Sequence, residues 1–335
     1  GEESKRVYGN RTIRDEEMRA QMDRATGDYN AFWAGRDYIN DMAPMKAALL
    51  MSHGFNDWNV MPEHSYRIYN KAREMGLPVQ IYYHQGGHGG PPPISMMNRW
   101  FTRYLFEIEN GVEQDPKAWI VREGDDRLSP TPYPDYPNPL SEDVVVHLTK
   151  GGNTQGGLTT NKSRRKKEML IDDVSLAGEY LARVKSSPHR LLYTTPLLSD
   201  DLHISGTASI TLSLSSSEPA ANLSVWLVSL PWNDEDNASI YDNIITRGWA
   251  DPQNHESIYT SQPLKPGEFY DITFELQPDD QIIPAGQQLG LMIFSSDREF
   301  TLHPTPGTEL KIDLKRSSLT LPIVGGLSKF ENSQK

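Results

Sequence analysis

The amino-acid sequence predicts two structural parts, an α/β part over residues 1–125 and an all-β part over residues 141–335. Up to residue 125, short apolar runs alternate with stretches of helical period, the pattern of strands and helices in turn. Beyond residue 140, short runs rich in β-branched and aromatic residues are separated by turn residues. Between the parts, residues 126–140 contain five prolines, and we expect a linker without regular structure there.

We expect the α/β part to contain two strands, each followed by a helix. The first strand is a continuous apolar run, as expected when both faces of a strand are buried. The helices show apolar residues at three- and four-residue spacing and end at glycine. We expect these elements at residues 47–51 (strand), 63–74 (helix), 79–83 (strand) and 95–108 (helix), after a mostly helical segment at residues 11–41. This order predicts parallel strands in one sheet.

The all-β part shows several runs in which apolar and polar residues alternate with period two. Turn residues such as Pro266-Gly267 separate the runs. The expected strands lie at residues 144–148, 204–214, 223–228, 270–276 and 289–294. Many short strands with turns between them predict a jelly-roll (sandwich) domain.

The composition narrows the partners that the chain can have. Of the 335 residues, 37% are hydrophobic and 23% are charged, and the formal net charge is −12. Nucleic-acid binding needs a concentrated positive field, so this charge argues against a nucleic-acid partner. The chain has no cysteine, which excludes disulfides, thiolate metal sites and a cysteine nucleophile. No apolar run approaches the roughly 20 residues of a membrane span, so we expect no membrane partner and a cytoplasmic location, with secretion left open.

Two loops, each following an expected strand, carry residues that could do chemistry. The first reads HGFNDWNV from His53 and contains Asp57, and the second reads HQGGHG from His84 and contains His88. The carboxyl ends of parallel strands meet at one edge of a sheet, so Asp57 and His88 should lie close together. A carboxylate bonded to one imidazole nitrogen fixes the tautomer that lets the other nitrogen take a proton from a nucleophile. We expect both residues to be catalytic, in the triad order serine, aspartate, histidine.

The serine of such a triad is missing from the places where this order requires it. The nucleophile should lie in a G-x-S-x-G motif before the aspartate, and residues 1–56 contain no such motif. Ser52 stands at the end of the strand that precedes Asp57 and is a poor candidate. We therefore expect the nucleophile and its strands to lie N-terminal to this chain, and the chain alone to be inactive.

Three further residues of these loops allow more than one interpretation. We expect His53 to hydrogen-bond its own loop rather than to act in catalysis. His84 and His88 are four positions apart, a metal-ligand spacing on a helix, but the glycines between them argue against a helix and against a metal site. Trp58, next to Asp57, could line a substrate pocket or pack under its loop.

Several segments resemble one known family. They are SHGFNDWNVMPEHSY, HQGGHGG and TGDYNAFW in the α/β part, and GEFYDITFELQP and LGLMIFSSDREFT in the all-β part. Together they resemble the bacterial Xaa-Pro dipeptidyl-peptidases, serine peptidases of the α/β-hydrolase fold that are grouped with cocaine esterases and α-amino-acid ester hydrolases. The resemblance extends over nearly the whole chain.

The resemblance implies the C-terminal portion of an α/β-hydrolase domain over residues 1–125 and the family's jelly-roll domain over residues 141–335. It implies Asp57 as the triad carboxylate and His88 as the general base. It also implies a homodimer and a peptide substrate with proline second from a free amino end. This chemistry needs no cofactor. An esterase or acylase of the same superfamily would use the same Asp57 and His88, and a non-catalytic binding module built on the all-β part is the other alternative.

Overall fold

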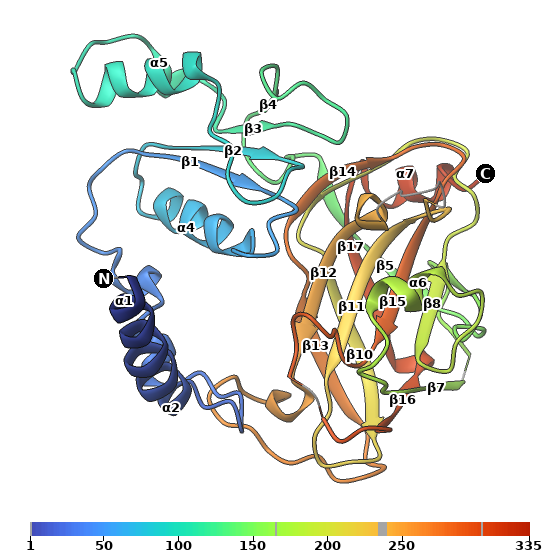
Figure 1. Cartoon of the computed structure of the whole chain (residues 1–335). Helices are drawn as coiled ribbons and strands as arrows, with labels where there is room; N and C mark the ends of the chain where they lie inside the picture. Colours follow the sequence, from blue (N-terminus) through green and yellow to red (C-terminus); the bar gives the residue numbers. More distant parts are fainter. Residues whose placement is uncertain (1, 165, 234–239, 303) are drawn as a thin grey trace.

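The computed structural model describes residues 2–164, 166–233, 240–302 and 304–335. It is a mixed α/β fold with extensive sheet, in which the α/β part lies beside the β part (Figure 1). No helix in these ranges is long and apolar enough to cross a bilayer.

The α/β part is built on a four-stranded sheet in the order β1-β2-β3-β4. Its strands are β1 (Leu49–Gly54), β2 (Val79–His84), β3 (Ala118–Ile120) and β4 (Thr131–Tyr133). Its connections contain α4 (Glu63–Glu74), α5 (Ile94–Tyr104) and η3 (Val112–Gln114). Strands β1, β2 and β3 are parallel, so the predicted strand-helix order and the parallel pairing are confirmed.

The core of this part lies between the sheet and α4. Tyr69 and Ala72 on the buried face of α4 pack with strand residues such as Ile81 and Ile120, all of them fully buried. This apolar face explains why the 63–74 pattern folds as a helix against the sheet. Residue by residue, β2 is buried along its whole length, as a central parallel strand requires.

The prediction that residues 126–140 lack regular structure is wrong for β4. This short strand pairs antiparallel with β3, and Pro132 lies opposite Trp119. β4 is the last strand of the sheet, where the missing N–H of a proline removes no ladder hydrogen bond. Tyr133 and Tyr136 are buried in the same core as α4. The predicted domain boundaries at residues 125 and 141 stay a prediction.

The β part consists of mostly antiparallel strands. They are β5 (Ser141–Leu148), β6 (Gly156–Thr159), β7 (Lys167–Ile171), β8 (Arg190–Thr194), β9 (Leu202–Gly206), β10 (Ser209–Ser216), β11 (Leu223–Leu230), β12 (Ile244–Ala250), β13 (Tyr270–Glu275), β14 (Asp279–Ile283), β15 (Gln288–Phe294), β16 (Glu309–Asp313) and β17 (Ser318–Val324). The order is β12-β11-β15-β8-β6-β5-β17-β10-β16-β7, with β13 beside β10 and β9 between β14 and β17. Short helices complete it: α6 (Gly178–Arg183), η4 (Ile240–Asn243), η5 (Pro252–Asn254), η6 (Leu314–Arg316) and α7 (Gly326–Asn332).

One large hydrophobic cluster takes side chains from most of these strands, which explains their alternating pattern. All five predicted strands are present, but the run at residues 204–214 forms two strands rather than one. The break follows Gly206, whose φ of 126° a residue with a side chain rarely adopts.

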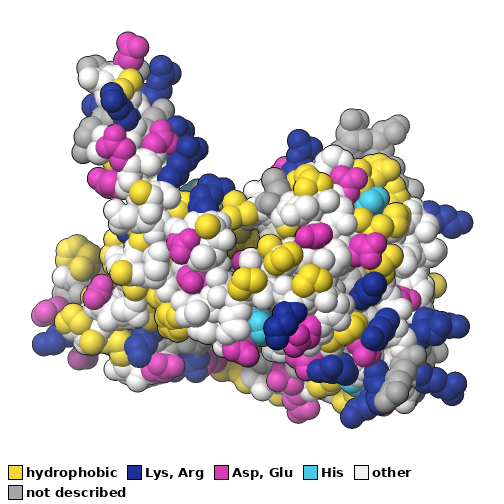
Figure 2. Space-filling view, turned by 90° about the horizontal axis from the view of Figure 1, so that it is seen from below, with side chains coloured by type: hydrophobic (Ala, Val, Ile, Leu, Met, Phe, Trp, Pro, Cys, Tyr) yellow, Lys and Arg dark blue, Asp and Glu magenta, His cyan; other side chains and the backbone are white. Residues whose placement is uncertain are grey.

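The N-terminal segment is helical over α1 (Glu2–Tyr8), the π-helical stretch η1 (Gly9–Met18) and α2 (Arg19–Gln21), followed by α3 (Ala31–Ala34) and η2 (Tyr38–Asp41). The helical prediction for residues 11–41 is confirmed, and a turn near Gly27 interrupts the helices. The first helices project from the body of the molecule and carry mixed basic and acidic side chains (Figure 2). Residues after this turn hydrogen-bond to the β part: Tyr29 N donates to Ile258 O at 2.7 Å, and Asp28 accepts from Ser261 N at 2.7 Å.

Candidate active site

The two predicted loops meet at the carboxyl ends of β1 and β2. Gly54, the last residue of β1, lies opposite His84, the last residue of β2. Phe55 N donates to His84 O at 2.7 Å, so the ladder continues into the loops. A Cβ on Gly54 would lie 2.1 Å from Gly86 O, which means that only glycine permits this approach. The adjacency expected from the chain order is present.

Asp57 and His88 form a hydrogen-bonded pair across these loops. His88 Nδ1 lies 2.8 Å from Asp57 Oδ2. The Asp57 side chain is 3% exposed, whereas that of His88 is 65% exposed. The pair therefore consists of a buried carboxylate that holds an accessible imidazole, the arrangement that fixes one tautomer of the ring.

The surroundings of Asp57 keep it ionised. Burial alone would raise the pKa of its carboxyl. Hydrogen bonds from the backbone amides of Val60 and Asn59, at 3.0 and 3.1 Å, and from the His88 ring outweigh burial and hold the pKa of Asp57 below its ordinary value. An ionised Asp57 accepts only, so the His88 ring donates from Nδ1 and presents Nε2 as its basic nitrogen.

His53 hydrogen-bonds its own loop, as predicted, with Nε2 at 2.8 Å from Val60 O. Its Nδ1 lies 2.8 Å from Ser65 Oγ at the start of α4. A further contact was not predicted from the sequence: His53 Nε2 is also 3.3 Å from Asp57 Oδ2. The H-G-x-x-D spacing, which puts His53 four positions before Asp57, could have indicated this contact.

His84 is a buried structural residue in this geometry. Its Nδ1 accepts a hydrogen bond from Gly86 N at 3.0 Å, inside its own loop. Burial, aided by the charge of Arg127, lowers the pKa of His84 to about 4, so the ring is neutral near pH 7. The structure thus gives His84 and His88 different surroundings.

Ser52 lies in the same cavity as the pair but is engaged elsewhere. The cavity has a volume of about 360 Å³ and is lined by Ser52, His53, Asp57, Val60, His88, Gly89, Gly90 and Pro91. The Ser52 hydroxyl donates to Gly90 O at 2.5 Å. Within the described ranges, no serine hydroxyl hydrogen-bonds to His88.

Trp58 contacts the β part. Its ring lies 4.6 Å from the Arg247 guanidinium and meets Trp249 edge to face, with the ring centroids 6.4 Å apart. It also lines a second cavity, of about 290 Å³, between the two parts, with Asn56, Gln85, Glu123, Asp242, Ile244 and Gln281. Trp58 thus packs against the β part and also lines a cavity; that this cavity takes substrate stays a prediction.

Several residues of the β part reach the two loops and were not predicted from the sequence. Besides Arg247 and Trp249, Asp279 and Asp280 of β14 accept hydrogen bonds from Gln85. Gln85 lies inside the HQGGHG loop and could have been singled out there. Its partners lie almost 200 positions away, and no local pattern marks them.

Two family descriptions match the chain. "X-Pro dipeptidyl-peptidase (S15 family)" matches residues 3–90, and "X-Pro dipeptidyl-peptidase C-terminal non-catalytic domain" matches residues 110–326. A putative Xaa-Pro dipeptidyl-peptidase of Rhodopirellula baltica is 59% identical over 333 residues, 99% of this chain and 53% of that protein. One of Bacillus anthracis is 35% identical over 315 residues, 92% of this chain and 50% of that protein.

Solved structures show the same fold at low sequence identity. An aminopeptidase from a marine sediment Thaumarchaeota archaeon superposes with a TM-score of 0.71 at 14% identity, over 91% of this chain and 60% of that one. A CocE/NonD family hydrolase of Staphylococcus aureus gives 0.68 at 15% identity, over 89% and 57%. An α-amino acid ester hydrolase gives 0.65 at 14% identity, over 88% and 59%.

The chain spans about half the length of the curated relatives that it matches. The matched residues include both loops of the Asp57–His88 pair and most of the β part. On these matches, the chain belongs to the X-Pro dipeptidyl-peptidase family and corresponds to a C-terminal portion of such a protein.

Proposed function

We propose that this chain is the C-terminal part of a serine-type Xaa-Pro dipeptidyl-peptidase, in which His88 is the general base and Asp57 orients it. The observation that carries the proposal is the 2.8 Å hydrogen bond between a buried, ionised carboxylate and an exposed imidazole. The family membership supports it, because the relatives are named as peptidases of this kind.

The chemistry follows from the protonation states of the pair. His88 Nε2 takes the proton of a serine hydroxyl while the serine oxygen attacks the substrate carbonyl carbon. The resulting imidazolium is stabilised by Asp57, and its Nε2 proton passes to the leaving amine as the peptide bond breaks. Water then attacks the acyl-serine with His88 acting again as base and then as acid, which releases the dipeptide and restores the serine.

The serine would come from polypeptide outside this chain. Among the described residues β1 pairs with β2 alone, so its other edge is open to a further strand. The apolar residues of β1 are only half buried, whereas those of β2 are fully buried. A parallel strand added beside β1 would cover this edge and would present its own carboxyl end near His88.

The substrate class is a proposal that rests on the names of the relatives. We propose a peptide with a free amino end and proline at the second position. The fold similarity to a CocE/NonD family hydrolase and an α-amino acid ester hydrolase keeps an esterase or acylase as the alternative. For the β part, a large hydrophobic core enclosed by mostly antiparallel strands supports the proposal of a jelly roll.

The test uses the full-length protein with an Xaa-Pro anilide and a simple ester of matched size. We expect turnover of the anilide, and His88→Ala should lower its kcat by about 10⁴-fold or more. His64→Ala, which removes an exposed imidazole from α4, is the matched control and should keep full activity. Anilide turnover by the His88→Ala variant close to wild type would refute the catalytic role. Selective turnover of the ester would favour the alternative, and residues 1–335 alone should be inactive.

A further inference from the structure

The Gln85 side chain connects the His88 loop to the β part. Gln85 directly follows β2, three positions before His88. Its Nε2 donates to the backbone oxygen of Asp280 at 2.8 Å and to Asp279 Oδ1 at 3.3 Å. Both acceptors stand at the start of β14, so the loop of the proposed general base is hydrogen-bonded to a strand of the other part.

Gln85 also joins the two catalytic loops to each other. Its backbone oxygen accepts from Asn56 Nδ2 at 2.8 Å, and Asn56 is the residue before Asp57. In addition, Asn56 N donates to Gly86 O at 3.3 Å. A shift at Gln85 would therefore disturb the contact between the loops that carry Asp57 and His88, and not only the position of one loop.

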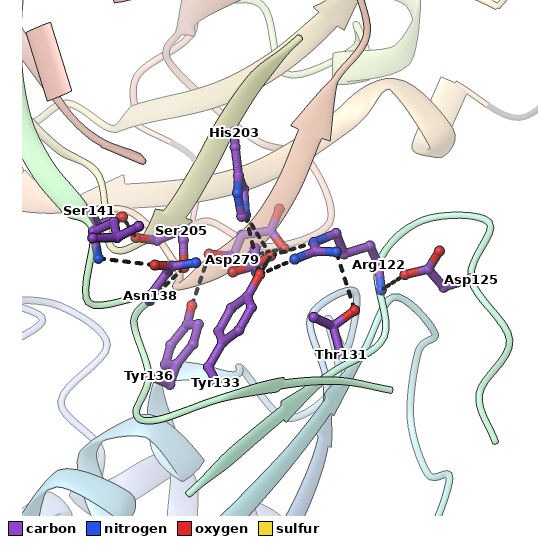
Figure 3. Close-up of polar contacts among 12 residues, drawn as sticks. Arg122, Asp125, Thr131, Tyr133, Tyr136, Asn138, Ser141, His203, Ser205 and Asp279 are labelled. Carbon is purple, nitrogen blue, oxygen red and sulfur yellow. Dashed lines mark hydrogen bonds and ion pairs between the residues drawn. The ribbon is translucent and has the colours of Figure 1, made fainter. Parts of the chain in front are cut away.

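The attachment point on β14 is itself held firmly. The fully buried Asp280 carboxylate has His203 Nε2 at 2.9 Å, and it accepts from the Tyr133 hydroxyl at 3.1 Å and from Arg122 Nε at 3.4 Å. Figure 3 shows Arg122, Tyr133 and His203 converging on this strand. One residue away, the hydroxyl of buried Tyr136 donates to Asp279 O at 2.9 Å.

Apart from Gln85, the loop is held by hydrogen bonds within the α/β part, among them Gly86 N to His84 Nδ1 at 3.0 Å and Ser52 Oγ to Gly90 O at 2.5 Å. It contains Gly86, Gly87, Gly89 and Gly90, and glycine leaves the backbone the widest conformational freedom. His88 itself is mostly exposed, and its bond to Asp57 is its one hydrogen bond in the described ranges. Because a displacement of about 1 Å in a catalytic group can cost about 100-fold in rate, the anchor of this loop matters for catalysis.

We propose that Gln85 is a positioning residue through which β14 sets the place of His88 relative to Asp57. The β part, although its family description calls it non-catalytic, thereby supplies one support of the active site. This inference rests on the proposed function, because it assumes that His88 acts as the base.

The test is a matched pair of substitutions in the full-length protein, Gln85→Met and Gln288→Met. Gln288 is also half buried, and its Nε2 donates to Thr195 O at 2.6 Å and to Thr194 Oγ1 at 3.3 Å, entirely within the β part. Each substitution thus removes one bond to a backbone oxygen and one to a side-chain oxygen, and Gln85→Met also removes the 3.5 Å contact of Asn56 Nδ2 with Gln85 Oε1. For Gln85→Met we expect kcat to fall about 10- to 100-fold with KM within about 3-fold of wild type. The rate of serine modification by a fluorophosphonate should fall by the same factor as kcat.

A merely structural role would lower the melting temperature of both variants and leave kcat of the folded protein unchanged. The positioning role is overturned if Gln85→Met keeps kcat within about 2-fold of wild type, or loses no more than Gln288→Met. Should Gln85→Met fail to fold, Gln85→Asn, which keeps the amide but shortens its reach, is judged by the same criteria. His88→Ala separates the two proposals. If His88→Ala is inactive while Gln85→Met keeps wild-type kcat, only the positioning role fails. If His88→Ala is active, the proposed function fails.

Discussion

Replacing Asp57 with asparagine tests the central contact of the site with the least change in shape. The substitution Asp57→Asn retains an Oδ1 atom, so the amides of Asn59 and Val60 keep their acceptor at this position. A side-chain NH₂ replaces Oδ2, which lies 2.8 Å from His88 Nδ1. Because an NH₂ group donates and cannot accept, His88 Nδ1 must become the acceptor, and the His88 ring adopts the tautomer that carries its proton on Nε2.

That tautomer cannot take a proton from a serine, so the expected loss is large. For a serine hydrolase with intact geometry, the same exchange costs about 10⁴-fold in kcat, which corresponds to about 5 kcal/mol of activation free energy. The effect on folding has a pH dependence of known sign. Because the folded protein lowers the pKa of Asp57, the stability that its ionised form adds is complete above the unfolded pKa of about 4 and is lost as the pH falls through the folded pKa.

The assay is steady-state hydrolysis of an Xaa-Pro anilide by the full-length protein, with unfolding followed at about pH 7 and at lower pH. Asp172→Asn is the matched control, because Asp172 is equally buried and accepts a backbone amide, from Ser296 N at 2.9 Å, in the β part. It should keep full kcat. An Asp57→Asn variant that retains more than about a tenth of wild-type kcat would refute the tautomer argument.

Two further predictions concern the loops around the pair. Gly54→Ala should lower the free energy of unfolding by about 3 kcal/mol, because its Cβ would lie 2.1 Å from Gly86 O and force the loops apart. In Gly35→Ala the nearest atom to the new Cβ lies at 3.4 Å, so this control should change the free energy of unfolding little. Equal melting temperatures of the two variants would contradict this prediction. Trp58→Ala should lower the free energy of unfolding by about 2 kcal/mol, because the contact with Arg247 is lost. The variant should also have a higher KM if the cavity that Trp58 lines takes substrate. An unchanged KM would leave Trp58 with a packing role alone.

The elements that the sequence predicted correctly are those with a strong local pattern. β1 begins with a continuous apolar run, β2 is rich in β-branched and aromatic residues, and α4 has a clear apolar face between a proline start and a glycine stop. β3 and β4 were missed because each has three residues, too few for a period, and because Pro132 argued against a strand. Only the position of β4 at the edge of the sheet makes that proline acceptable.

The Asp57–His88 pair could be predicted from the sequence. The strand-helix-strand order makes β1 and β2 parallel neighbours, so the loops that follow them begin side by side. The accessibility of His88 and the lowered pKa of Asp57 required coordinates, because they depend on which backbone amides the loop turns toward the carboxylate.

Local sequence determined where the chemistry lies, since strands, turns and the residues that follow them are short-range features. Tertiary structure decided what holds that chemistry in place. Gln85 meets Asp280, 195 positions away, because the α/β part packs against the β part, and no period or motif in a single chain records which surfaces will meet.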